Sequence, residues 1–175
     1  MRKDLMALAL FLCASTAHAA EKPAELQSVI QAQTPYGSGL YTVMLLDVYE
    51  AQLWTDAPRW SWNVPFALTL NYHMNIDGSD LSQKSIDEIN AQSSLSPQQL
   101  KDYKAQLAPL FPDVRQGDEI TALYKPRHGI AFYHNGTYTG AISDPLLAKR
   151  FLSIWLAEKT SAPDLRQSLL ALAPQ

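Results

Sequence analysis

The chain has 175 residues, of which 47% are hydrophobic, 10% aromatic and 18% charged. This composition excludes a disordered polymer, a collagen repeat and a charge-rich coiled coil, and the length suits one domain. Because the formal net charge is −3 and no basic stripe is present, the sequence also argues against binding to nucleic acid.

Residues 1–19 have the three parts of a secretory signal peptide. Arg2 and Lys3 provide a positive start, an apolar run follows, and Ala17-His18-Ala19 supplies the small residues of a cleavage site. The apolar run is too short to span a bilayer, and no later segment approaches a membrane span. We therefore expect cleavage after Ala19 and a soluble mature protein.

The single cysteine, Cys13, lies within this signal peptide. The mature chain would therefore have no disulfide and no thiolate metal site, and the bulky Leu12 argues against lipid attachment at Cys13. An exported, cysteine-free, mildly acidic protein fits a bacterial periplasm. We expect a polar lead-in over residues 20–35 and one domain over residues 36–175.

Strand signals dominate the first part of this domain. Tyr36-Gly37-Ser38-Gly39 predicts a turn because glycine reaches backbone angles that are closed to other residues. Residues 40–54 are rich in β-favouring side chains and too long for one strand, so we predict two strands with a bend near residues 47–50. A turn over residues 58–63 and an alternating strand over residues 66–74 follow.

The rest of the chain predicts two helices, then a group of strands, and then two more helices. An amphipathic helix follows Asp77, and Ser96-Pro97-Gln98-Gln99 opens a second helix with the pattern of a capping box. Residues 118–124 predict a strand, and Asn135-Gly136 predicts a hairpin with a type I′ turn. Asp144-Pro145 begins a helix with a firm apolar stripe, and a last helix follows. This order indicates an α+β fold, with helices on one face of a large antiparallel sheet.

No catalytic or metal-binding motif stands out. The mature histidines His73, His128 and His134 do not share a helix at ligand spacing, and His-Glu-x-x-His is absent. A Gly-x-Ser-x-Gly nucleophile motif is absent as well. We therefore expect no metal and no cofactor.

Several segments together resemble the bacterial chalcone isomerase-like proteins. They extend from about Gly37 to Leu172, and their order and spacing carry the likeness. The main segments are Gly39-Leu40 before a strand through Asp47-Val48-Tyr49, Ala67-Leu68-Thr69-Leu70-Asn71-Tyr72, Phe111-Pro112-Asp113-Val114, Gly129-Ile130-Ala131-Phe132-Tyr133-His134-Asn135-Gly136 and Phe151-Leu152-Ser153-Ile154-Trp155-Leu156.

The resemblance implies an open-faced β-sandwich with a layer of helices on one face of the sheet. It also implies a cleft between sheet and helices, where plant enzymes of this fold cyclise a chalcone with the help of an arginine, and where other members bind fatty acids. The arginine position falls just after Gly39-Leu40, where this chain has Tyr41. A neutral tyrosine does not supply the fixed cation that would stabilise an oxyanion. Met74 or Asn75 stands where many bacterial relatives carry another arginine.

We therefore expect a non-catalytic periplasmic module that binds a small apolar or amphipathic ligand, either a fatty acid or an aromatic compound. The expected ligand-lining residues are Tyr41, Tyr49 and Tyr72. One alternative is an isomerase (an intramolecular lyase) of chalcone-like substrates that uses Tyr41 as its acid. The second alternative is a protein interaction module at the cell envelope, with Trp60 and Trp62 as exposed anchors.

Overall fold

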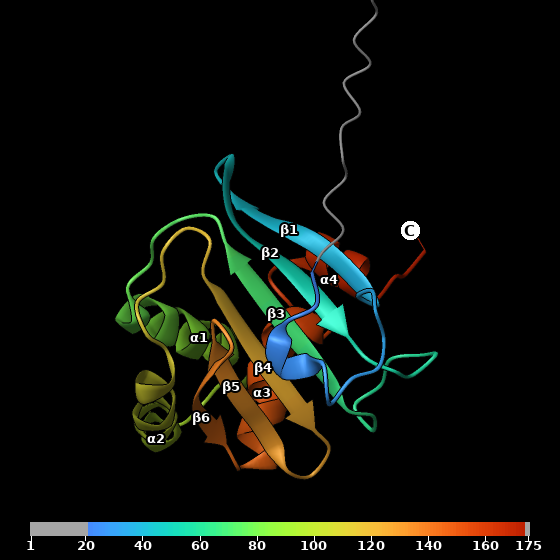
Figure 1. Ribbon diagram of the computed structural model, residues 1–175. Coiled ribbons are helices and arrows are strands. Elements are labelled where there is room, and N and C mark those ends of the chain that lie inside the picture. Colours follow the sequence, from blue (N-terminus) through green and yellow to red (C-terminus); the bar gives the residue numbers. More distant parts are fainter. Residues whose placement is uncertain (1–20, 174–175) are drawn as a thin grey trace, which may run out of the picture.

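The computed structural model describes residues 21–173, which form a six-stranded antiparallel sheet with α-helices on one face (Figure 1). The strands lie side by side in chain order, so each pairs with its neighbours in the sequence. Their bounds are β1 Gly37–Val43, β2 Leu46–Trp54, β3 Phe66–Tyr72, β4 Glu119–Lys125, β5 Gly129–His134 and β6 Thr137–Ile142. The predicted α+β class, with its open sheet covered by helices, is confirmed.

Four α-helices accompany the sheet. Their bounds are α1 Gly78–Ser93, α2 Pro97–Leu107, α3 Pro145–Leu156 and α4 Pro163–Leu169, with 3₁₀ turns η1 Ala24–Leu26 and η2 Ala108–Leu110. Figure 1 shows α1, α3 and α4 behind the sheet, on the side that we call the inner face. Among the described residues, no helix combines the length and apolar character needed to cross a bilayer. The signal peptide predicted for residues 1–19 lies outside the described residues.

The helix starts follow the predicted chemistry. Ser96 Oγ accepts a hydrogen bond from Gln99 N at 3.2 Å, and Gln99 Oε1 accepts one from Ser96 N at 3.0 Å, which completes the capping box of α2. Asp144 Oδ1 accepts a hydrogen bond from Leu146 N at 2.8 Å, and Pro145 occupies the first turn of α3. The predicted apolar stripe of α3 is buried against the sheet; its members are Leu147, Phe151, Ile154 and Trp155.

The first hairpin differs from the prediction. Two strands form as predicted, but the turn between them lies earlier, at Met44-Leu45, and the stretch 47–50 belongs to β2, where the pairing with β1 contains a β-bulge at Val48. Both turn residues have positive φ, 49° and 69°. Such a two-residue turn normally carries Asn or Gly. Because Met44 and Leu45 are apolar, no signal in the sequence indicates a turn at this position. The β5–β6 hairpin turns at Asn135-Gly136, as predicted, with φ of 48° and 78°.

The predicted turn over residues 36–39 is also wrong, because β1 begins at Gly37. Its glycines serve close packing instead. Helix α4 lies so near β1 that a Cβ atom at Gly37 would overlap the backbone oxygens of Ser168 and Leu169. The close approach of α4 therefore explains the glycines that open the sheet.

The N-terminal segment packs on the outer face of the sheet, opposite α3 (Figure 1). Leu26 and Ile30 are buried there in a second apolar cluster, which contains Trp54, Ala67 and Leu123. The segment expected as a polar lead-in thus contributes two core side chains. The isolated apolar residues gave no periodic pattern, because the segment contains only a short 3₁₀ turn.

The expected exposed tryptophan anchors are not present. Trp60 and Trp62 are half-buried and pack against the main core. Each ring meets Phe66 edge-on, with centroid distances of 5.8 Å and 5.9 Å. Trp62 also meets Tyr124 edge-on at 6.1 Å, so both tryptophans contribute to packing at this end of the core.

Glu119 lies on the outer face, near Glu25 of the N-terminal segment. Both carboxylate oxygens of Glu25 are buried and lack a hydrogen-bond partner among the described residues. Burial, and then the nearby charge of Glu25, raise the pKa of Glu119 to about 7. The folded protein therefore keeps a proton on Glu119 at pH values where the unfolded chain has lost it.

We predict that this buried carboxyl makes the protein less stable as the pH rises from about 4.5 to about 7. Glu119→Gln should raise the free energy of unfolding by about 1 kcal/mol at pH 8, a figure reduced for partial exposure, and by nothing at pH 4.5. Urea denaturation at the two pH values measures the difference, with Glu158→Gln on the exposed surface as the control. An equal gain at both pH values would contradict the assignment.

We also predict that the turn at Met44-Leu45 costs stability. Replacing the pair by Asn-Gly should stabilise the protein by about 1 kcal/mol, because side chains other than Gly and Asn are strained at positive φ. Thermal denaturation should show a rise in Tm of about 2–4 °C. The opposite exchange at Asn135-Gly136, to Met-Leu, should lower Tm, and an unchanged Tm in both variants would refute the argument.

Candidate ligand-binding site

A cavity of about 460 Å³ lies between the inner face of the sheet and helices α1 and α3. This volume lies in the range of about 300–1,000 Å³ that is typical of small-molecule sites. Its walls are mainly apolar and change from buried to exposed along its length. The buried end includes Phe111, Phe132, Phe151 and Trp155, and the exposed end includes Val43, Met44, Leu46 and Met74.

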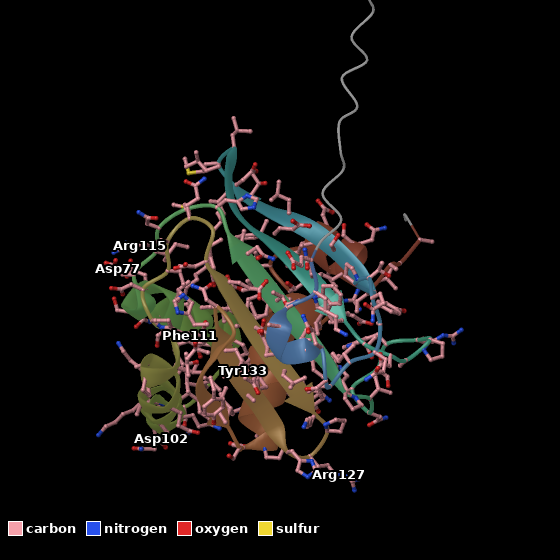
Figure 2. The ribbon with its side chains drawn as sticks, viewed as in Figure 1. Asp77, Asp102, Phe111, Arg115, Arg127 and Tyr133 are labelled. Atoms are coloured by element: carbon pink, nitrogen blue, oxygen red, sulfur yellow. The ribbon has the colours of Figure 1, made fainter. Side chains whose placement is uncertain are left out.

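Aromatic side chains close the buried end of the pocket. Phe132 meets Phe111 and Phe151 edge-on, with ring centroids 5.5 Å and 5.2 Å apart. Phe151 also meets Trp155, one helical turn further along α3, at 5.4 Å. Figure 2 shows Phe111 among the side chains between α1 and the sheet. Such packed rings form a rigid apolar wall that suits a hydrocarbon chain or an aromatic ligand.

The three predicted tyrosines lie together in one row across the sheet. The strand register places Tyr41 opposite Tyr49, and Tyr49 opposite Tyr72. The Tyr41 and Tyr49 rings stack with centroids 5.0 Å apart, and Tyr72 meets Tyr49 edge-on at 5.8 Å. All three line the pocket. Their role in binding a ligand stays a prediction.

A hydrogen bond connects this row to the helix layer. Trp155 Nε1 on α3 donates to Tyr49 Oη on β2 at 2.9 Å. Because Tyr49 Oη accepts this bond, its own proton remains available to donate to a ligand. Burial raises the pKa of both Tyr49 and Tyr72 above the usual range of a phenol, so both stay protonated at neutral pH.

Charged groups gather on the α1 side of the pocket. Lys84 Nζ lies 2.8 Å from Glu88 Oε1, and Ser161 Oγ donates to Glu88 Oε2 at 2.8 Å. Burial alone would raise the pKa of Glu88, but the hydrogen bonds from Lys84 and Ser161 bring it below its ordinary value. The hydrogen bond with Glu88 raises the pKa of Lys84 in turn. Lys84 is therefore a cation whose side chain is 67% exposed at the edge of an apolar pocket.

The pocket lacks the arginine that the family resemblance would supply. Tyr41 stands at that position and lines the pocket, and Lys84 is the only cationic side chain among the described lining residues. Arg150 donates to Tyr103 Oη at 2.6 Å, in the helix layer. Arg115 is exposed on the loop before β4, at the edge of the molecule (Figure 2). Within residues 21–173, no group of three His, Cys, Asp or Glu side chains could hold a metal.

Sequence reasoning missed the helical side of the pocket. Asp80, Lys84 and Glu88 all line it from α1. Their spacing of four residues places them on one helix face, and this signal could have been found. Trp155 was expected only as part of an apolar stripe. Its bond with Tyr49 joins residues that are 106 positions apart, which no local pattern reveals.

Comparisons with known proteins agree with this architecture. The model of the chalcone isomerase-like family matches residues 15–171. No curated protein sequence matches the chain. Among solved structures, the crystal structure of a fatty-acid binding protein from Arabidopsis thaliana superimposes with a TM-score of 0.57 at 13% sequence identity, covering 78% of this chain and 86% of that one. At this identity the similarity shows a shared fold.

The family match extends over most of the chain, and the observed sheet with its single layer of helices is the architecture that the match implies. The chain belongs to the chalcone isomerase-like family.

Proposed function

We propose that this protein binds a small amphipathic ligand of the fatty-acid class in the pocket between sheet and helices, and that it does not turn the ligand over. The observation that carries the proposal is the apolar cavity of about 460 Å³ beside the row of Tyr41, Tyr49 and Tyr72. The crystal structure of similar fold is that of a fatty-acid binding protein, which supports the same ligand class.

The distribution of polar groups supports one orientation of the ligand. The hydrocarbon chain would lie against Phe132 and Phe151, where the pocket is buried and apolar. The carboxylate would lie toward Lys84, whose ammonium group is exposed at the pocket edge, and toward the hydroxyl proton of Tyr49. A carboxylate placed there keeps contact with water, and it would share the ammonium group of Lys84 with Glu88, which already pairs with it.

The chemistry of the lining supports binding without catalysis. A guanidinium is missing among the described lining residues, so no fixed planar cation stabilises a developing oxyanion. The raised pKa values of Tyr49 and Tyr72 keep both phenols neutral, so neither serves as a base near neutral pH. Incubation with a chalcone should therefore give no cyclised product.

We propose further that the N-terminal segment exports the protein, so that the pocket works in the bacterial periplasm. The support is the pattern of residues 1–19, with its positive start, apolar run and small-residue cleavage motif.

Filling the pocket should weaken ligand binding. Ser85 lies on α1 and lines the cavity, and Ser85→Phe places a ring in the space for the ligand. We expect affinity for a fluorescent long-chain fatty acid to fall by about tenfold or more. Ser79→Phe, an exposed site on the same helix, is the matched control and should bind like the parent. Equal affinities of the two variants would count against the pocket as the binding site.

Removing the cation should affect only ligands that carry a negative charge. Lys84→Met should weaken fatty-acid binding about three- to tenfold, because a charge-assisted contact at an exposed site is partly screened. The affinity of Lys84→Met for the fatty alcohol of equal length should equal that of the parent. Lys101→Met, on α2, is the control and should bind the fatty acid like the parent. Calorimetric titration measures both ligands, and equal losses for acid and alcohol would contradict the orientation.

A further inference from the structure

The tip of the β1–β2 hairpin is an exposed apolar surface. It consists of Val43, Met44, Leu45 and Leu46, which we call the hairpin tip. Their exposed fractions are 43%, 91%, 96% and 63%. Figure 1 shows the hairpin extending beyond the ends of the neighbouring strands, so the tip projects from the body of the molecule. Four consecutive exposed apolar side chains indicate a binding surface rather than scattered surface residues.

The backbone conformation of the tip disfavours the apolar residues that it carries. Met44 and Leu45 occupy the two turn positions, with φ of 49° and 69°. Asn and Gly are the residues that such a turn favours, and they are polar or small. The chain therefore carries two large apolar side chains at positions where both backbone geometry and solubility favour small or polar residues. Sites that break local rules in this way often serve function.

The hairpin tip is continuous with the ligand pocket. Val43, Met44 and Leu46 all line the pocket, at the end opposite the buried phenylalanines. A ligand that leaves the pocket past these residues therefore moves along an unbroken apolar surface to the tip. A ligand that follows this route enters the pocket from, or leaves it into, the phase that surrounds the hairpin tip.

We propose that the hairpin tip inserts into the surface of a lipid bilayer, and that this docking lets an amphipathic ligand pass between the bilayer and the pocket. Docking itself stands on the tip alone, whereas the passage of ligand rests on the proposed binding function.

The shape of the tip favours a bilayer over a folded partner. A stable protein interface buries about 800 Å² on each partner, usually on a broad surface. A projecting turn of four side chains offers much less than this, but it fits a fluid surface that closes around it. The polar pair just behind the tip limits the depth: Thr42 Oγ1 donates to exposed Asp47 Oδ1 at 3.0 Å, and a carboxylate does not enter hydrocarbon readily.

The charge of the hairpin determines which bilayers it should accept. Residues 37–54 contain no lysine or arginine, and the whole chain has a formal net charge of −3. Attraction to anionic headgroups therefore contributes little, and burial of apolar side chains is the driving force. Docking should be at least as strong on neutral vesicles as on anionic ones, and on neutral vesicles it should be insensitive to salt.

Flotation with phosphatidylcholine vesicles tests the docking. We expect the parent protein to float with the vesicles at low and high salt. The Asn-Gly variant at Met44-Leu45 should reduce the bound fraction about tenfold or more, although it should fold at least as well as the parent. Leu146→Ser removes another exposed leucine at the start of α3 and should float like the parent.

Three results would overturn the proposal. The first is a parent protein that stays with the aqueous fraction, and the second is an Asn-Gly variant that floats equally well. The third is binding confined to anionic vesicles and lost in salt. Self-association through the tip, seen as a concentration-dependent mass that the Asn-Gly variant abolishes, would identify a second copy as the occupant and overturn it too.

A separate measurement keeps this test distinct from the test of ligand binding. Leu45 does not line the pocket, so Leu45→Gly should bind a fluorescent fatty acid in solution like the parent while it floats less. Flotation that depends on the tip, combined with no fatty-acid binding in any variant, would retain docking and reject the proposed function. Fatty-acid binding without flotation would reject docking alone.

Discussion

The pocket depends on the hydrogen bond that joins the sheet to the helix layer, from Trp155 Nε1 to Tyr49 Oη. The buried Nε1 atoms of Trp54 and Trp60 have no hydrogen-bond partner among the described residues, whereas Tyr49 supplies one to Trp155 from the middle of the tyrosine row. This contact links α3, which packs against β5 and β6, to β2, and both residues line the cavity. A core packed evenly over the whole inner face would leave no room for a ligand, and this polar contact connects sheet and helices beside the space that stays open.

The two ends of the pocket differ in burial and in packing. At the buried end, packed aromatic rings give rigidity and a dry apolar wall. At the exposed end, the hairpin tip departs from the preferred chemistry of its own turn and leaves Met44 and Leu45 almost fully accessible. At this end of the pocket, positive φ values and large exposed apolar side chains therefore occur together in the same two turn residues.

The two faces of the sheet are covered in different ways. The inner face carries helices and the pocket, whereas Leu26 and Ile30 of the N-terminal segment cover part of the outer face. Near this segment the outer face is polar, and Glu119 lies close to Glu25 with a raised pKa. The outer covering is therefore sensitive to pH, and the inner face, with neutral tyrosines at its centre, is not organised around a titrating group near neutral pH.

Local signals in the sequence determined the elements and their class. Capping residues such as Ser96 and Asp144, the Asn135-Gly136 turn and the apolar stripe of α3 each act through neighbours a few positions away, so they could be predicted. Tyr41 and Tyr49 were expected to share a face through alternation along one strand, but the structure places them opposite each other on two paired strands, so their contact comes from the hairpin. Tertiary structure alone decided the position of the first turn, the burial of Trp60 and Trp62, and the bond between Tyr49 and Trp155. The bond between Tyr49 and Trp155 joins distant segments, and in the other two features packing overrides the local preference.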